Sequence, residues 1–141
     1  MRYVCDSCSA FKWVVTEAHS DKADRLRQDY RNGTHELLAP DVFPVEIAHA
    51  LTRAERQGRI AVSQAAVLWA DVMATAPVLH PYLPLLPRAI VISSQQRVGV
   101  YDCLYVALAE REGCELVTAD DRLVRNLQGR FSFIVPLASL P

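Results

Sequence analysis

The sequence YDCLYVALAEREGCELVTADDRLVRNL, residues 101–127, contains signals for a helix, a strand and a second helix in succession. Residues 101–111 are strongly apolar, and the Gly113 that follows is typical of a helix C-terminus. Residues 115–118, with Leu116 and Val117 at their centre, have the length of a strand, and residues 120–127 have helical spacing. This order of elements predicts an α/β fold.

The rest of the chain has the same alternation of strands and helices. A mainly parallel sheet flanked by helices is therefore expected. Its length of 141 residues predicts one domain, residues 1–141. The proline-rich segment 78–87 is expected to be turns or a short strand. Further strands are expected at 2–6, 36–39 and 132–135, and further helices at 9–17, 21–31, 40 or 41 to 57, 64–76 and 88–96.

The bulk composition is that of a soluble globular protein, with 51% apolar and 22% charged residues. No apolar run approaches the ~20 residues of a membrane helix. The N-terminal segment reaches Asp6 too soon to hold the apolar core of a signal peptide. We therefore expect a cytoplasmic protein without a membrane segment.

Four acidic residues lie inside or at the end of apolar stretches, where a solvated carboxylate is not expected: Asp6, Glu46, Asp102 and Asp120. Removing a lone carboxylate from water costs several kcal/mol or shifts its pKa, so such groups are paired or bind a cation. Each has an ordinary explanation by itself. Asp6 and Asp120 suit helix N-caps, and Glu46 and Asp102 suit the favourable end of a helix dipole.

A divalent cation accounts for all four acids together. Mg²⁺ and Mn²⁺ prefer oxygen ligands, and they bind through carboxylates, waters and substrate phosphates. Asp6 and Asp120 each follow an expected strand, and ligands in parallel α/β sheets bind beyond the carboxyl ends of the strands. The sequence thus predicts a metal-dependent enzyme with these two acids on one rim of the sheet.

The charge pattern leaves a nucleic-acid partner open. The formal net charge of −1 gives no support to such a partner. However, sixteen acidic residues less the four would leave twelve, against fifteen basic residues. Basic residues near the four acids would form a rim that holds RNA phosphates, or would be ordinary solvated helix faces. They are Lys12, Arg53, Arg56, Arg97, Arg122 and Arg125.

Four segments resemble those of PIN-domain proteins in the family's order. Residues 4–13, VCDSCSAFKW, resemble the first strand and helix, and residues 40–51, PDVFPVEIAHAL, the glutamate-bearing helix. Residues 101–110, YDCLYVALAE, and 117–123, VTADDRL, are similar to the third and fourth segments. The compact length is most like VapC-type toxins of toxin–antitoxin pairs.

This resemblance implies a three-layer α/β/α domain and a Mg²⁺- or Mn²⁺-dependent endoribonuclease acting on RNA. It also implies a homodimer silenced by a small antitoxin protein. The ligands of the metal would be Asp6, Asp102 and Asp120, and Glu46 would orient or deprotonate the attacking water. The chain departs from the family at Cys8, where serine or threonine is common.

Other interpretations rest on weaker patterns. At position 49, where the family commonly has asparagine, Glu46 and His49 make half of a di-iron motif, but a second pair is absent. Cys5 and Cys8 have the C-x-x-C spacing of zinc and redox sites, but the chain has no second such pair. A Mg-dependent phospho-acceptor module would need adjacent acids after the first strand and a suitable lysine. A non-catalytic PIN-like protein with a structural metal remains the main alternative.

Overall fold

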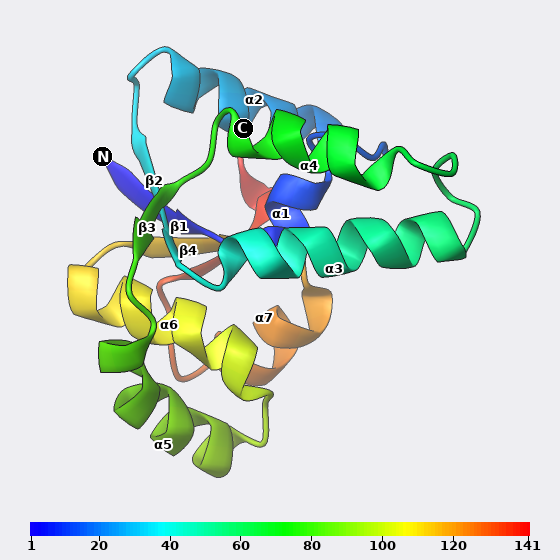
Figure 1. Cartoon of the computed structure of the whole chain (residues 1–141). Helices are drawn as coiled ribbons and strands as arrows, with labels where there is room; N and C mark the ends of the chain where they lie inside the picture. The colour runs from blue at the N-terminus through cyan, green and yellow to red at the C-terminus, as the bar shows by residue number, and fades with distance from the viewer.

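A five-stranded sheet with helices on both faces forms the framework of the computed structural model, which describes residues 1–141 (Figure 1). The strands are β1 (Arg2–Cys5), β2 (Glu36–Pro40), β3 (Val78–His80), β4 (Glu115–Thr118) and β5 (Ile134–Pro136). The helices are α1 (Ser7–Phe11), α2 (Ser20–Arg31), α3 (Phe43–Arg56), α4 (Ala65–Met73), α5 (Leu86–Gln96), α6 (Val100–Glu112) and α7 (Asp121–Leu127), with 3₁₀ turns η1 (Leu83–Leu85) and η2 (Leu137–Ser139).

The strand order is β3-β2-β1-β4-β5, and every neighbouring pair is parallel. Val4 at the centre of the sheet pairs with Leu38 of β2 on one side and Leu116 of β4 on the other. The strand order therefore reverses at β1, between β1 and β4. Such a switch point opens a crevice beyond the carboxyl ends of the two strands, where ligands of α/β sheets bind.

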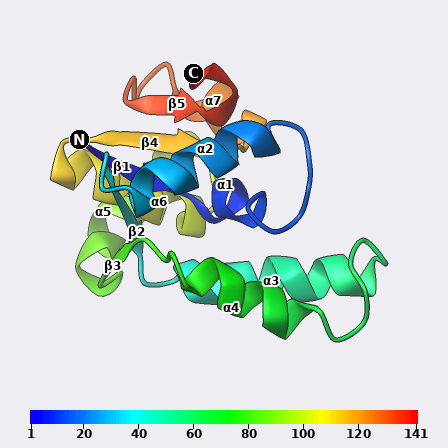
Figure 2. The same cartoon turned by 90° about the horizontal axis from the view of Figure 1, so that it is seen from above.

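Helices form a layer on each face of the sheet, which confirms the expected three-layer α/β/α architecture. Helix α6 packs against β1, β2 and β4 on one face, with α5 packed on its outer side. Helix α2 lies over the opposite face (Figures 1 and 2). The seven consecutive residues from Cys103 to Ala109 are all buried, because α6 is enclosed between the sheet and α5.

Helices α3 and α4 pack together and project past the carboxyl edge of the sheet (Figure 2). The indole Nε1 of Trp69 donates to the carbonyl of Pro44 at 3.0 Å, which fixes α4 against the start of α3. Arg27 of α2 donates to the Asp71 carboxylate at 2.9 Å and lies 5.0 Å from the ring of Trp13. Both tryptophans therefore pack within the domain.

The predicted elements are all present, and most boundaries agree within a few residues. The expected helix at 9–17 is wrong in extent, because α1 ends at Phe11 and tight turns follow. The β-branched residues Val14, Val15 and Thr16 disfavour a continued helix. No helix in the chain combines the length and apolar character needed to cross a bilayer.

Candidate active site

Asp6 and Asp120 lie at the switch point of the sheet, at the carboxyl ends of the adjacent strands β1 and β4. The pairing of Cys5 with Val117 places the two strand ends side by side. Asp6 is the N-cap of α1 and Asp120 the N-cap of α7. The shared rim predicted from the sequence is confirmed, and so is the capping role that each acid has by itself.

Asp6 is almost completely buried, with 5% of its surface exposed. Its Oδ1 accepts the backbone N–H of Ser9 at 2.9 Å, and its Oδ2 accepts the hydroxyl of Thr118. Burial raises the pKa of Asp6 to about 6, and the charge of Asp102 adds to this rise while the hydrogen bonds from Thr118 and Ser9 oppose it. Asp6 is thus a carboxylate held under electrostatic strain in the absence of a cation.

Thr118 links the two strand-end acids, and sequence reasoning did not assign it a role. Its hydroxyl oxygen accepts the backbone N–H of Asp120 at 3.0 Å and donates its own hydrogen to Asp6. The side chain of Asp120 turns to α7, where Oδ1 accepts the N–H groups of Arg122 at 2.9 Å and Leu123 at 3.3 Å. The Thr-x-Asp order of residues 118–120 is the signal that marks this bridge.

Glu46 lies in the first turn of α3, directly beyond the end of β2. Its Oε1 accepts the hydroxyl of Tyr105 at 2.6 Å and the hydroxyl of Ser7 at 3.5 Å. Burial raises the pKa of Glu46, and the charge of Asp102 raises it further, against the hydrogen bonds from Tyr105 and Ser7. Tyr105 could not be distinguished from a core residue in the sequence, because it stands inside a long apolar run.

Asp102 differs from the other three acids because no protein group donates a hydrogen bond to it. It lies in the first turn of α6, half-buried. Burial and the charge of Asp120 raise its pKa, and the guanidinium of Arg122 acts in the opposite direction. Its oxygens are therefore free to bind a ligand.

All four acids lie within electrostatic reach of a single thiol, that of Cys8. The pKa of Cys8 is raised well above its usual value, first by the charge of Asp6, then by partial burial, and then by Asp120, Asp102 and Glu46. The four carboxylates predicted from the sequence are therefore neighbours. In particular, the fold brings together Glu46 and Asp102, which come from helices far apart in the chain.

The donor set suits a hard divalent cation, because it consists of carboxylate oxygens that repel one another without a counter-charge. No three Asp, Glu, His or Cys side chains are close enough to share one ion directly as they stand. Mg²⁺ usually binds through only one or two carboxylates and keeps several waters. The acids fit such an ion, and the ligand set Asp6, Asp102 and Asp120 stays a prediction.

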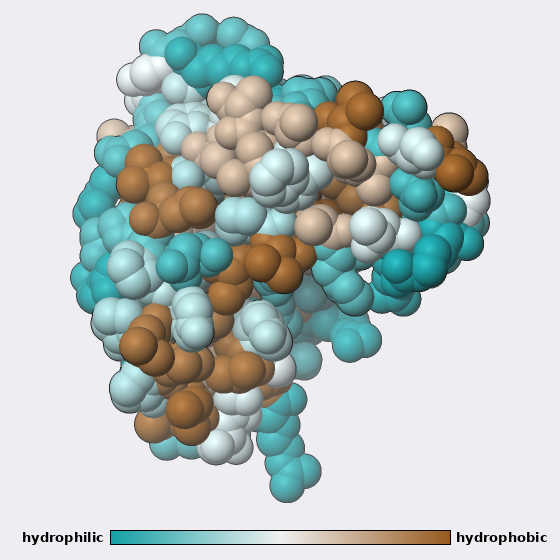
Figure 3. Space-filling model, in the orientation of Figure 1, coloured by the Kyte–Doolittle hydropathy of each residue, from teal (hydrophilic) through white to brown (hydrophobic).

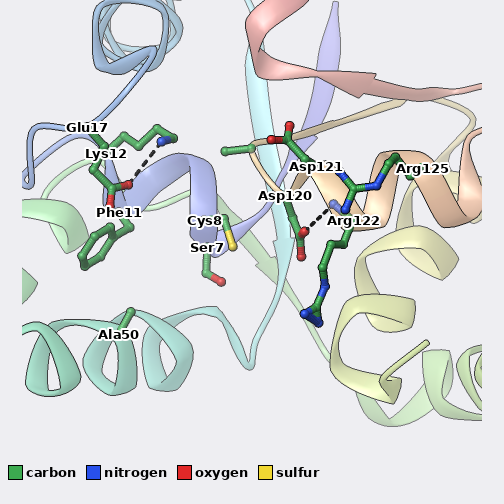
Figure 4. A pocket seen from close by; sticks show the side chains of 11 residues that line it. Ser7, Cys8, Phe11, Lys12, Glu17, Ala50, Asp120, Asp121, Arg122 and Arg125 are labelled. Atoms are coloured by element: carbon green, nitrogen blue, oxygen red, sulfur yellow. Dashed lines mark hydrogen bonds and ion pairs between the residues drawn. The ribbon is translucent and has the colours of Figure 1, made fainter. Parts of the chain in front are cut away.

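A cavity of about 550 Å³ opens beside these acids, between α1 and α7 (Figure 4). Ser7 and Cys8 face Asp120 and Arg122 across it. Lys12, predicted to belong to a basic rim, forms an ion pair with Glu17 at 3.2 Å on the far side. The cavity is open and polar enough to take a charged substrate next to the carboxylates.

Residues 3–127 match the sequence profile of the PIN domain family. The chain belongs to the PIN domain family. It is 30% identical to Ribonuclease VapC3 of Pyrobaculum aerophilum over 128 residues, which cover 89% of this chain and 95% of that protein. It is 33% identical to Ribonuclease VapC3 of Mycobacterium tuberculosis over 106 residues, 75% of this chain and 74% of the relative.

A solved structure supports the same PIN fold. The crystal structure of PAE2754 from Pyrobaculum aerophilum superposes with a TM-score of 0.69, covering 99% of this chain and 94% of the other. The sequence identity of that pair is 23%, so the likeness concerns the fold alone. The predicted VapC-type PIN domain with a three-layer architecture is therefore confirmed.

The two departures from the PIN pattern have separate structural outcomes. At Cys8 no hydroxyl is available, and Thr118 supplies the hydroxyl contact to Asp6 instead. The hydroxyl of Ser7 contacts Glu46 instead. His49 is exposed and lines a cavity of about 480 Å³ together with Glu46, to which it forms no hydrogen bond.

Proposed function

We propose that this PIN domain is a Mg²⁺- or Mn²⁺-dependent endoribonuclease that hydrolyses RNA phosphodiester bonds. One observation carries the proposal: four carboxylates lie within electrostatic reach of Cys8, two of them just beyond β1 and β4 at the switch point of the sheet and two in the first turns of α3 and α6, and no basic side chain forms an ion pair with any of them. The relatives named as VapC ribonucleases support RNA as the substrate class.

The four acids have two proposed roles. Asp6, Asp102 and Asp120 would hold the ion, with Thr118 fixing the orientation of Asp6. A divalent ion in such a site lowers the pKa of water and stabilises the charge on a phosphate. Glu46 would orient the attacking water and accept its proton. Its raised pKa lies nearer to neutral pH, where a general base works best, and Tyr105 holds its carboxylate in place.

We also propose that the protein is the toxin of a type II toxin–antitoxin pair, acting in the cytoplasm and silenced by a small antitoxin protein. The VapC relatives support this assignment. An antitoxin that covers the carboxylates would block the access of RNA to the active site and would also balance the negative charge of the carboxylates.

A homodimer is the proposed assembly, because the outer face of the α5 side is apolar and exposed (Figure 3). Leu83, Ile90 and Val91 expose 67%, 53% and 42% of their surfaces. Contiguous apolar surface of this kind marks an interaction site. We expect light scattering to give twice the chain mass of 15.7 kDa, and Ile90→Lys to halve it. A wild-type protein that is monomeric at high concentration would contradict this assembly.

The deciding experiment incubates the purified protein with total cellular RNA, with Mg²⁺, with Mn²⁺ or with EDTA. Asp6→Ala serves as the inactive control. We expect cleavage only in the wild type with a divalent ion, and sequencing of the new RNA ends would identify the target. Cleavage that persists in EDTA or in Asp6→Ala would refute the proposal. Stabilisation by Mn²⁺ without cleavage of any RNA would instead indicate a binding protein with a structural metal.

A further inference from the structure

A small polar cavity lies where the turn between α5 and α6 meets the start of α7. It has a volume of about 130 Å³, which is room for several waters and hence for a group as small as a phosphate. Two acids of the active site, Asp102 and Asp120, form part of its lining. The other polar side chains that line it are Arg97, Arg122 and Asn126, all of them donors.

The two arginines of this cavity have no partner within the protein. Neither guanidinium takes part in an ion pair or in a side-chain hydrogen bond, although both line the same cavity as two acids. The charge of Arg122 reaches Asp102 and opposes the rise in the pKa of that carboxyl. Two unpaired guanidiniums beside an acidic centre suit an anion that the acids themselves repel.

Arg97 has a backbone conformation that favours glycine. It ends α5 with φ 56° and ψ 45°, the left-handed region, where a β-carbon is unfavourable. The turn is well defined, because the N–H of Arg97 donates to the carbonyl of Ser93 at 2.9 Å and the hydroxyl of Ser93 donates to that of Val98 at 2.6 Å. A helix usually has glycine at such a terminus, so an arginine at position 97 carries a conformational cost.

We infer that Arg97 and Arg122 form a subsite for the RNA phosphate that neighbours the scissile one, with Asn126 as an additional donor. This inference rests on the proposed ribonuclease function and specifies how its substrate is held. Asp102 and Asp120 repel the phosphate from the part of the cavity that they line. Arg97 and Arg122 attract it to the part that they line. The other four predicted basic residues lie elsewhere. Lys12 is paired with Glu17, Arg53 and Arg56 lie at the far end of α3, and Arg125 lines the larger cavity between α1 and α7.

The test measures binding rather than cleavage. All proteins carry Asp6→Asn, which prevents cleavage without changing the lining of this cavity. Binding of a fluorescent single-stranded oligoribonucleotide is followed by anisotropy at several salt concentrations. Arg97→Gly should weaken binding about three- to tenfold and reduce the slope of log K against log salt by roughly 0.7, the value for one phosphate on a single strand.

A second readout separates RNA contact from a structural role. Since glycine relieves the left-handed backbone, Arg97→Gly should raise the Tm by about 2 °C while it weakens RNA binding. Arg130→Gly is the matched control, because Arg130 is exposed and unpaired and follows α7 at the opposite edge of the sheet. Unchanged affinity and slope in Arg97→Gly would overturn the inference. A fall in both Tm and affinity, or an equal loss in Arg130→Gly, would also overturn it.

Neutral linkages identify the bound group as a phosphate. Methylphosphonate is placed at each linkage of the RNA in turn. At one position the neutral linkage should cost the protein with an intact cavity more affinity than it costs Arg97→Gly, because Arg97→Gly has already lost one of the two cations that the phosphate charge attracts. Additive losses at every position would refute the subsite. Because cleavage is absent throughout, these results are independent of whether the wild type cuts RNA.

Discussion

Asp102→Asn is expected to reduce RNA cleavage by about three orders of magnitude, roughly 4 kcal/mol of transition-state stabilisation, while the domain stays folded. The fold tolerates the change because Asp102 accepts no hydrogen bond from the protein and caps no helix. The active site does not tolerate the change, because an amide at position 102 removes one negative charge from the proposed metal ligands. Cleavage rates and circular dichroism of the purified variant measure the two effects.

Two further variants make this result specific. Asp21→Asn changes an exposed acid in the first turn of α2 and should cleave as the wild type does. Glu46→Gln should also lose most cleavage, yet keep the thermal stabilisation by Mn²⁺ that Asp102→Asn loses, since Glu46 is proposed to act on water rather than to hold the ion. Asp102→Asn with wild-type activity would contradict its role as a ligand.

Asp6→Asn is expected to stabilise the metal-free protein at pH 7.5 by up to about 3 kcal/mol. The folded protein raises the pKa of Asp6 to about 6 from an ordinary 3.8, so it binds this proton more tightly than the unfolded chain does. The free energy of unfolding therefore falls as the pH rises from about 4 to 6, and the full penalty is present above pH 6. An amide in place of the carboxylate removes it.

Urea unfolding in EDTA at pH 5 and pH 7.5 tests this expectation. The difference between variant and wild type should be larger at pH 7.5, and taking the difference at each pH removes the contributions of titrating groups that do not interact with Asp6. Asp41→Asn is the control, because Asp41 follows β2 as Asp6 follows β1 but is exposed. Addition of Mn²⁺ should stabilise the wild type and reverse the order. A variant no more stable than the wild type at pH 7.5 would refute electrostatic strain at Asp6.

Periodicity and helix-ending signals were sufficient to predict the architecture. The glycine after residues 101–112 and the short strand signal at 115–118 define α6 and β4, and strands that alternate with helices favour a largely parallel sheet. The helix expected at 9–17 was overextended because its first half has good helical spacing. The β-branched run at 14–16 then opposes the helix, and local spacing does not weigh these two effects.

The sequence by itself determined which residues are candidates for the active site. A carboxylate in an apolar setting is energetically unusual wherever it stands, so Asp6, Glu46, Asp102 and Asp120 could be identified without coordinates. Their hydrogen-bond partners were not identified, because Thr118 and Tyr105 look like ordinary strand and core residues in the sequence. Only the side-by-side pairing of β1 with β4 turns Thr118 into a bridge between Asp6 and Asp120.

The tertiary structure decided which charged groups act together. Lys12, Arg53, Arg97 and Arg122 are equivalent as a list of basic residues near acids. Packing pairs Lys12 with Glu17, carries Arg53 to the far end of α3, and leaves Arg97 and Arg122 unpaired around one cavity. Electrostatic interactions depend on distance and burial in space, and separation along the chain fixes neither. The sequence thus determined the chemistry available to this protein, and the fold determined where that chemistry can take place.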